Sequence, residues 1–278
     1  MAYAGSEEAA HVTAEFATRN PAVRVRCIRC APGLTRQRNA AIDAATADVL
    51  FFLDDDIRLE PDCIAEILDA FARHPAGELI AVSPMIREPR LGPLNRFVHR
   101  IFMLPHEGDG VLLPSGHTSA PFSLPNAPEM RIEIAAGCCA YRRSVFDAER
   151  FDAFFSGYGY MEDREFSLRA RRHGDILLAP RAVTHHLQTP CARIDKERLG
   201  RMMVVNHWYV AQRHLPHDWV HRLCFAWSEF GYGVFHLLRG LRRGDWRQLR
   251  GWRQGIRDIR RGDAPKPAPD APDDPESA

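Results

Sequence analysis

Short apolar runs and amphipathic stretches alternate along most of the chain. Apolar residues recur at helical spacing in 61–74, which predicts a helix, and the continuous apolar run 49–53 is typical of a buried strand. The same reading predicts helices over 6–18, 34–47 and 162–173, and strands over 23–29, 79–83, 132–136, 176–179 and 182–186. Strands and helices in this rhythm predict an α/β fold with a mostly parallel, Rossmann-like sheet that has helices on both faces.

Two further regions break this rhythm. Residues 84–128 are rich in Pro, Gly and His and are predicted to form long loops over the carboxyl edge of the sheet. From 195 to 261 the pattern is helical, and 262–278 is dominated by Pro, Asp and Ala, which predicts a disordered tail. The predicted organisation is a domain over 1–194, a helical region over 195–261 and the tail.

Composition narrows the class of protein. The 278 residues are 45% hydrophobic and 26% charged, which allows one sizeable core, and a net charge of +1 argues against a protein built around nucleic acid. The 7 cysteines are scattered and odd in number, which predicts reduced thiols and a cytoplasmic location; Cys27 and Cys30 lack a second pair, so no metal role is assigned to them. We find no targeting segment, and the most apolar window, 223–238, is too short and too interrupted to span a membrane.

Two acidic motifs carry the candidate chemistry. Asp54, Asp55 and Asp56 follow the apolar run 49–53, at the end of a strand where open α/β sheets bind ligands. Three adjacent carboxylates repel one another, so a divalent cation that also grips a phosphate would stabilise them; the alternative is a simple acidic turn. Glu162 and Asp163 open the second motif, and their alternative role is to cap the helix that follows.

Four segments in order, 32–41, 52–56, 136–146 and 162–169, resemble glycosyltransferase family 2. The resemblance implies a GT-A type fold and an inverting transfer of a sugar from a nucleotide-sugar donor to a hydroxyl acceptor. It also implies a divalent metal, manganese or magnesium, held by a DXD motif.

On the donor side, the resemblance assigns Asp54 and Asp56 to the metal and Asp55 to a sugar or ribose hydroxyl. The family often carries a histidine that completes the metal shell, and counting from Pro180 favours His186 over its neighbour. An imidazole ligand would favour manganese over magnesium.

Basic and polar residues at the start of the predicted helix 34–47 are candidates for the donor diphosphate. Arg36, Arg38 and Asn39 open that helix and would bond the phosphates from beneath; the alternative is that they merely solvate its first turn.

On the acceptor side, Asp163 resembles the family's general base, which takes the proton of the attacking hydroxyl. Glu162 would orient Asp163, and Gly137 marks a turn where the backbone comes close to substrate. A helix amino terminus favours the carboxylate form of Asp163, so proton transfer would accompany attack rather than precede it.

Arginines and apolar residues alternate over 239–261 with the period of a basic amphipathic helix. Such a helix could lie on the anionic inner face of a membrane and bring the site to a glycan or lipid-linked acceptor, as in synthesis of cell envelope polysaccharide. The alternative is a helix packed on the protein with a solvated arginine face. No nucleic-acid-binding module accompanies the arginines.

The chain departs from the family at its start. Family members usually open with a strand, a helix and a second strand that contacts the nucleotide base, so we expect the domain over 1–194 to be N-terminally incomplete. This leaves an alternative function, a non-catalytic remnant of such an enzyme that binds a membrane surface. A phosphatase of the haloacid dehalogenase type is a weaker alternative, because Arg58 stands where its motif needs Thr or Val.

Overall fold

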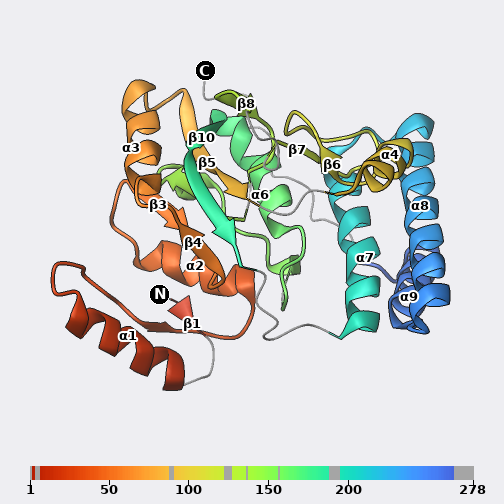
Figure 1. Ribbon diagram of the computed structural model, residues 1–278, viewed down its shortest axis with the longest axis horizontal. Helices are drawn as coiled ribbons and strands as arrows, with labels where there is room; N and C mark the ends of the chain where they lie inside the picture. The colour runs from red at the N-terminus through yellow and green to blue at the C-terminus, as the bar shows by residue number, and fades with distance from the viewer. Residues whose placement is uncertain are drawn as a thin grey trace. The chain divides into compact units, whose positions relative to one another are not determined.

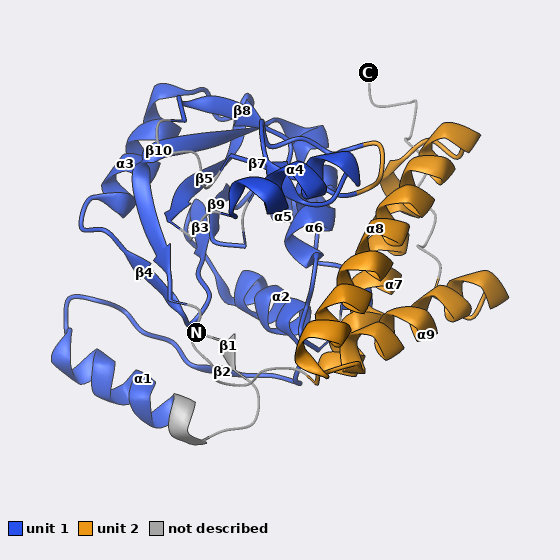
Figure 2. Cartoon of the chain, turned by 45° about the vertical axis from the view of Figure 1, so that its right-hand side comes forward, with its two compact units in different colours: residues 1–113, 117–194 blue, residues 114–116, 195–278 orange. Residues whose placement is uncertain are grey.

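The computed structural model describes residues 2–3, 7–87, 91–121, 127–135, 137–155, 157–187 and 195–265, with side chains from residue 10 onward. The chain divides into two compact units (Figure 2). Unit 1 comprises Met1–Leu113 and His117–Ile194, and unit 2 comprises Pro114–Gly116 and Asp195–Ala278. The predicted disordered tail, 262–278, lies outside the described residues beyond 265.

Unit 1 begins with a small parallel pair of strands. β1 (Ala2–Tyr3) pairs with β2 (Ile28–Arg29), and α1 (Glu7–Arg19) connects them. The strand predicted over 23–29 forms only in its last two residues.

The main sheet of unit 1 has the strand order β3-β9-β5-β10-β4, with β8 paired to β10 (Figures 1 and 2; β9 is labelled in Figure 2). Its strands are β3 (Val49–Phe52), β4 (Ile57–Leu59), β5 (Leu79–Arg87), β8 (Met130–Ile132), β9 (Cys139–Arg142) and β10 (Asp175–His186). β5 and β10 run parallel, whereas β9 is antiparallel to β3 and β5, and β4 and β8 are antiparallel to β10. The predicted α/β class is confirmed, but the sheet is mixed rather than mostly parallel, because apolar alternation does not encode strand direction.

Each face of the sheet is covered by helices, as predicted. Alternate residues of β10 divide between two cores: Ile176 and Leu178 pack with Phe166 on one side, and Leu177 packs with Ile67 on the other. The first face carries α2 (Leu34–Ala44), α5 (Val145–Ala148) and α6 (Glu162–Ala170), and the second carries α3 (Cys63–Arg73) (Figures 1 and 2). The two cores fix the strands whose ends carry the acidic motifs.

The region 84–128 contains more regular structure than predicted. β5 extends to Arg87, α4 (Pro93–Ile101) follows, and the short strands β6 (His106–Glu107) and β7 (Ser119–Ala120) pair in parallel. Pro93 occupies the first turn of α4, where its missing N–H costs no hydrogen bond.

Unit 2 consists of three helices in its described part: α7 (Lys196–His214), α8 (Trp219–Arg243) and α9 (Arg247–Arg261). Asp195 and Asp218 cap the first two, their carboxylates accepting hydrogen bonds from backbone N–H groups. The single amphipathic helix predicted over 239–261 is wrong, because α8 ends at Gly244, which has φ 66°. In the described part of the chain, no helix combines the length and the apolarity needed to cross a bilayer.

Glycines and tryptophans hold the three helices of unit 2 together. A Cβ at Gly251 of α9 would lie 1.8 Å from the Glu197 carbonyl oxygen of α7, so the two backbones touch. Trp246 and Trp252 lie over Gly240 and Gly233 of α8. Gly251 and Gly255 of α9 are thus buried within unit 2, whereas its apolar side chains Leu249, Trp252, Ile256 and Ile259 are half-buried.

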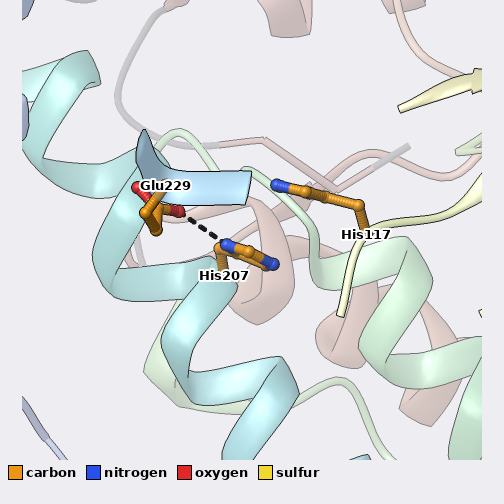
Figure 3. Close-up of side chains that lie close together, drawn as sticks. All are labelled: His117, His207 and Glu229. Atoms are coloured by element: carbon orange, nitrogen blue, oxygen red, sulfur yellow. Dashed lines mark hydrogen bonds and ion pairs between the residues drawn. The ribbon is translucent and has the colours of Figure 1, made fainter. Parts of the chain in front are cut away.

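A buried polar network also joins α7 to α8. The His207 ring contacts Glu229 through Nδ1 at 2.6 Å (Figure 3) and the Ser115 carbonyl oxygen through Nε2 at 2.8 Å. The second carboxylate oxygen of Glu229 accepts a hydrogen bond of 2.7 Å from the Trp252 indole. Because an unpaired buried carboxylate is costly, these partners fix which face of α8 points inward.

Candidate active site

The three aspartates lie in the turn that joins β3 to β4. The Ile57 N–H donates to the Asp54 carbonyl oxygen over 3.3 Å, which closes the turn. Asp55 is exposed at its tip, whereas Asp54 and Asp56 are half-buried. The motif is thus an acidic turn in which the Asp54 and Asp56 side chains are partly buried and the Asp55 side chain is exposed to solvent.

Strand pairing brings His186 to Asp56 across the sheet. The antiparallel register of β4 and β10 sets His186 opposite Ile57, and the Leu187 N–H donates to the Asp56 carbonyl oxygen over 2.8 Å. His186 Nε2 consequently lies 3.1 Å from Asp56 Oδ2. His185 points to the opposite face, where its ring contacts Glu60. The structure therefore places the histidine favoured by the sequence, and not its neighbour, at the motif.

Asp56 and His186 fit two ligands of one divalent cation. Two atoms that bind a small cation at about 2.1 Å and at right angles lie about 3 Å apart, close to the observed separation. A carboxylate with an imidazole suits manganese. In the described part of the chain, however, the ligand atoms of Asp54, Asp56 and His186 do not all lie within 4.8 Å of one another. Asp54 is therefore not gathered with the other two.

Asp54 is instead bonded to Arg38 of α2. The Arg38 guanidinium donates to Asp54 Oδ1 over 3.1 Å and to Glu162 Oε1 over 2.9 Å, and it lies 5.1 Å above the Phe151 ring. Burial opposes its charge, but Glu162, Asp54 and Asp163 outweigh burial and raise the pKa of Arg38 above its ordinary value. Arg38 thus joins the two acidic motifs, whereas the sequence assigned it to the diphosphate.

The other two residues assigned to the diphosphate differ in their surroundings. The Asn39 side chain donates to the Phe151 carbonyl oxygen over 2.9 Å and accepts from the Phe151 N–H over 3.0 Å, so it anchors the backbone. Arg36 is exposed, and its side chain lies beside Gly33. Of the three, Arg36 is placed best to meet an anion.

The acidic pair Glu162 and Asp163 opens α6, as the sequence predicts. The preceding residue, Met161, is buried and has φ 74°, a left-handed conformation that is uncommon for a residue with a side chain. Glu162 is buried against Arg38; burial raises the pKa of Glu162 above its ordinary value, Asp163 raises it further and Arg38 lowers it. Asp163 is only partly buried, and its Oδ1 accepts from the Arg164 N–H over 2.8 Å. Of the pair, Asp163 is the carboxylate that a substrate can reach.

Gly137 borders both acidic motifs. A Cβ at this position would lie 3.3 Å from Asp54 Oδ2 and 3.8 Å from Asp163 Oδ2. The Gly137 carbonyl oxygen also lies 3.5 Å from Arg38 Nη2. The missing side chain therefore leaves space beside the Asp54 and Asp163 carboxylates.

Sequence reasoning did not find the bond between Arg38 and Glu162. The two residues are 124 positions apart, and neither has a local pattern that names its partner. The sequence offered only a general indication of this ion pair. Two acidic motifs in one site need a buried cation between them, and an arginine inside a predicted helix is a candidate for that cation.

Comparison with known proteins identifies the family. The sequence model described as Glycosyl transferase family 2 matches residues 5–148, about half of the chain. A search of curated proteins gave no match.

Comparison with solved structures gives similarity at low sequence identity. S. aureus TarS 1–349 aligns with a TM-score of 0.50 and 11% identity over 89% of this chain and 67% of that one. GalNAc-T7 with UDP, GalNAc and Mn²⁺ aligns with a TM-score of 0.49 and 15% identity over 82% of this chain. This chain spans only 46% of the GalNAc-T7 chain. The fold of unit 1 is GT-A, as predicted, and the chain belongs to glycosyl transferase family 2.

Proposed function

We propose that the chain is an inverting glycosyltransferase that moves a sugar from a nucleotide-sugar donor to a hydroxyl acceptor. The observation that carries the proposal is that the Asp163 and Asp54 carboxylates both lie within 4 Å of the position that a Gly137 side chain would fill. An acceptor hydroxyl beside Asp163 and a donor beside the aspartate turn would then meet over a residue without a side chain.

In this mechanism, Asp163 accepts the proton of the acceptor hydroxyl as its oxygen attacks the anomeric carbon. The new C–O bond forms as the bond to the diphosphate breaks, on the opposite face of the sugar, so the anomeric centre inverts. Asp163 lies in the first turn of α6, and its role is to take the proton during attack, when the proton of the acceptor hydroxyl becomes acidic.

The remaining residues of the site hold this arrangement. Arg38 pairs with Asp54 and Glu162 and so keeps the two motifs at a fixed spacing. Asp56 and His186 would hold a divalent cation, manganese or magnesium, which when bound offsets the charge that develops on the leaving diphosphate. Exposed Asp55 would bond a donor hydroxyl, and Arg36 the diphosphate.

The acceptor class is a glycan or a lipid-linked glycan, as in the synthesis of cell envelope polysaccharide. A lipid-linked acceptor requires the enzyme to reach a membrane surface, and peripheral association with the inner membrane face is part of this proposal.

Two variants separate the proposed roles. Asp163→Asn should lower the transfer rate by about 10²- to 10⁴-fold while nucleoside diphosphate and Mn²⁺ still bind, because Asp163 acts on the acceptor. Asp56→Ala should weaken the metal-dependent binding of the nucleotide itself.

Calorimetric titration with a panel of nucleoside diphosphates plus Mn²⁺ measures the binding affinity, and a turnover assay measures the transfer rate. Asp43→Asn is the control, since Asp43 lies exposed on α2. Wild-type turnover in Asp163→Asn would contradict the assignment. A wild-type chain that binds nucleotide and metal yet transfers no sugar would favour the non-catalytic alternative.

A further inference from the structure

α8 of unit 2 exposes a continuous apolar stripe to solvent. Leu223 is 60% exposed and Leu241 is 66% exposed, large fractions for leucine side chains. The stripe consists of exposed residues on one side of the helix, spaced three, four or seven positions apart: Val220, Leu223, Trp227, Phe230, Leu237 and Leu241. Apolar side chains in such a run are uncommon on a surface that meets only water.

The stripe cannot turn inward, because the other side of α8 is already committed. Glu229 is buried and bonded to His207 and Trp252. Gly233 lies under Trp252 of α9, and Gly240 lies under Trp246, the residue that precedes α9. Rotation of α8 would leave the Glu229 carboxylate without these partners. The exposed stripe is therefore a fixed feature of the helix.

The charges of α8 identify what covers this stripe. α8 contains four arginines and no lysine: Arg222, Arg239, Arg242 and Arg243. Its one carboxylate, Glu229, is buried in the network with His207. A second copy of α8 carries the same excess of positive charge, so like charges would oppose the pairing of two such helices. An anionic lipid surface, by contrast, accepts the apolar stripe and attracts the arginines at once.

We propose that the apolar stripe of α8 is a docking surface for an anionic lipid bilayer, with Trp227 and Phe230 inserted among the headgroups. The sequence assigned a membrane-surface role to 239–261 together with the aromatic stretch 225–235 just upstream. Nearly all the exposed large apolar side chains of unit 2 lie on α8, so we place the docking surface there. The inference rests on the proposed function in one respect: the role of docking would be to bring the active site to a lipid-linked acceptor.

The test is flotation of the full chain with phosphatidylcholine vesicles that contain or lack phosphatidylglycerol, without donor or acceptor. Wild-type protein should float with the anionic vesicles at low salt and lose most of this binding as salt rises. The double variant Leu223→Glu and Phe230→Glu should reduce the floated fraction at least about tenfold, because each change removes an inserted side chain and adds a repelled charge.

A matched control adds the same two charges elsewhere. Val12 and Phe16 of α1 are also exposed, so Val12→Glu with Phe16→Glu changes net charge and surface apolarity equally. This control should float like the wild type. Circular dichroism and Mn²⁺-dependent nucleotide binding check that all three proteins are folded.

Three results would overturn the proposal: no flotation of the wild type, equal loss in both double variants, or a dimer that the α8 variant abolishes without any flotation. Failure of the proposed function is distinct, because it would show as absent nucleotide binding or turnover while vesicle binding persists.

Discussion

The guanidinium of Arg38 lies between carboxylates that stand 16 and 124 positions away in the sequence. A buried arginine is costly unless its charge is offset, and Asp54 and Glu162 supply that offset. The converse also holds, since Glu162 is buried and depends on Arg38. At the scale of single residues, the site is one interdependent set of charges.

Removing the arginine should therefore destabilise the protein as well as the site. We expect Arg38→Met to lower the free energy of unfolding by about 3–5 kcal/mol, because Glu162 is left buried without a counter-charge. Urea denaturation measures this change. Arg36→Met, two positions earlier and exposed, should change it by less than about 0.5 kcal/mol, and equal losses in the two variants would contradict the role given to Arg38.

The raised pKa of Glu162 predicts a pH dependence of stability. The Glu162 carboxyl group binds its proton more strongly in the folded state than in the unfolded chain. The resulting contribution to the free energy of unfolding is complete below an ordinary glutamate pKa of about 4.3, and it is lost as pH rises toward the raised pKa of Glu162. Glu162→Gln has no such proton to lose. The wild type should lose stability relative to the variant as pH rises, by up to about 1.4 kcal/mol for each unit by which the pKa is raised. Urea denaturation of both proteins across this range is the measurement, and a difference that does not vary with pH would refute the prediction.

Strand geometry decides which of two adjacent histidines serves the site. β10 turns His186 toward Asp56 and His185 toward Glu60. His186→Ala should weaken Mn²⁺ binding in the presence of a nucleoside diphosphate by at least about tenfold, and His185→Ala should leave it unchanged. Calorimetric titration of Mn²⁺ compares the two, and similar losses would show that the strand register does not select the ligand.

Elements with strong local signals were predictable from the sequence. α6 and the strand before the aspartate turn lie close to their predicted positions, because periodicity and flanking residues are local. α4 was missed, although Pro93 offered a start signal, since the surrounding Pro and Gly indicated loops. The reversal of β9 and the β4–β10 pairing were not predictable, because a buried strand shows the same apolar pattern in either direction.

The acidic motifs of the candidate site were likewise predictable, whereas their connection was not. Asp56 and His186 are brought together as the sequence suggested, but Asp54 is bonded to Arg38 instead of joining them. Asn39 looked like a phosphate ligand until its partner, the Phe151 backbone, was known. Such long-range hydrogen bonds depend on tertiary packing, which a single sequence does not spell out.

At the scale of the whole molecule, each unit contains its own buried interior. The cores on the two faces of the sheet consist of residues of unit 1, and the network around Glu229 joins residues of unit 2. The 5 tryptophans of the chain all lie in 208–252, so indole fluorescence reports on unit 2. Binding of nucleotide and metal would report on unit 1.

We therefore expect two unfolding transitions, which one substitution can separate. Gly251→Ala should lower the free energy of unfolding of unit 2 by about 1–3 kcal/mol, because the new Cβ would overlap the Glu197 carbonyl oxygen and force α7 from α9. The urea midpoint followed by tryptophan fluorescence should fall, while Mn²⁺-dependent nucleotide binding persists. Gly77→Ala, which meets nothing within 4 Å, is the control and should leave both readings unchanged. If fluorescence and nucleotide binding instead fell together in Gly251→Ala, the two units would unfold as one, and the packing of α7 on α9 would be a determinant of the active site itself.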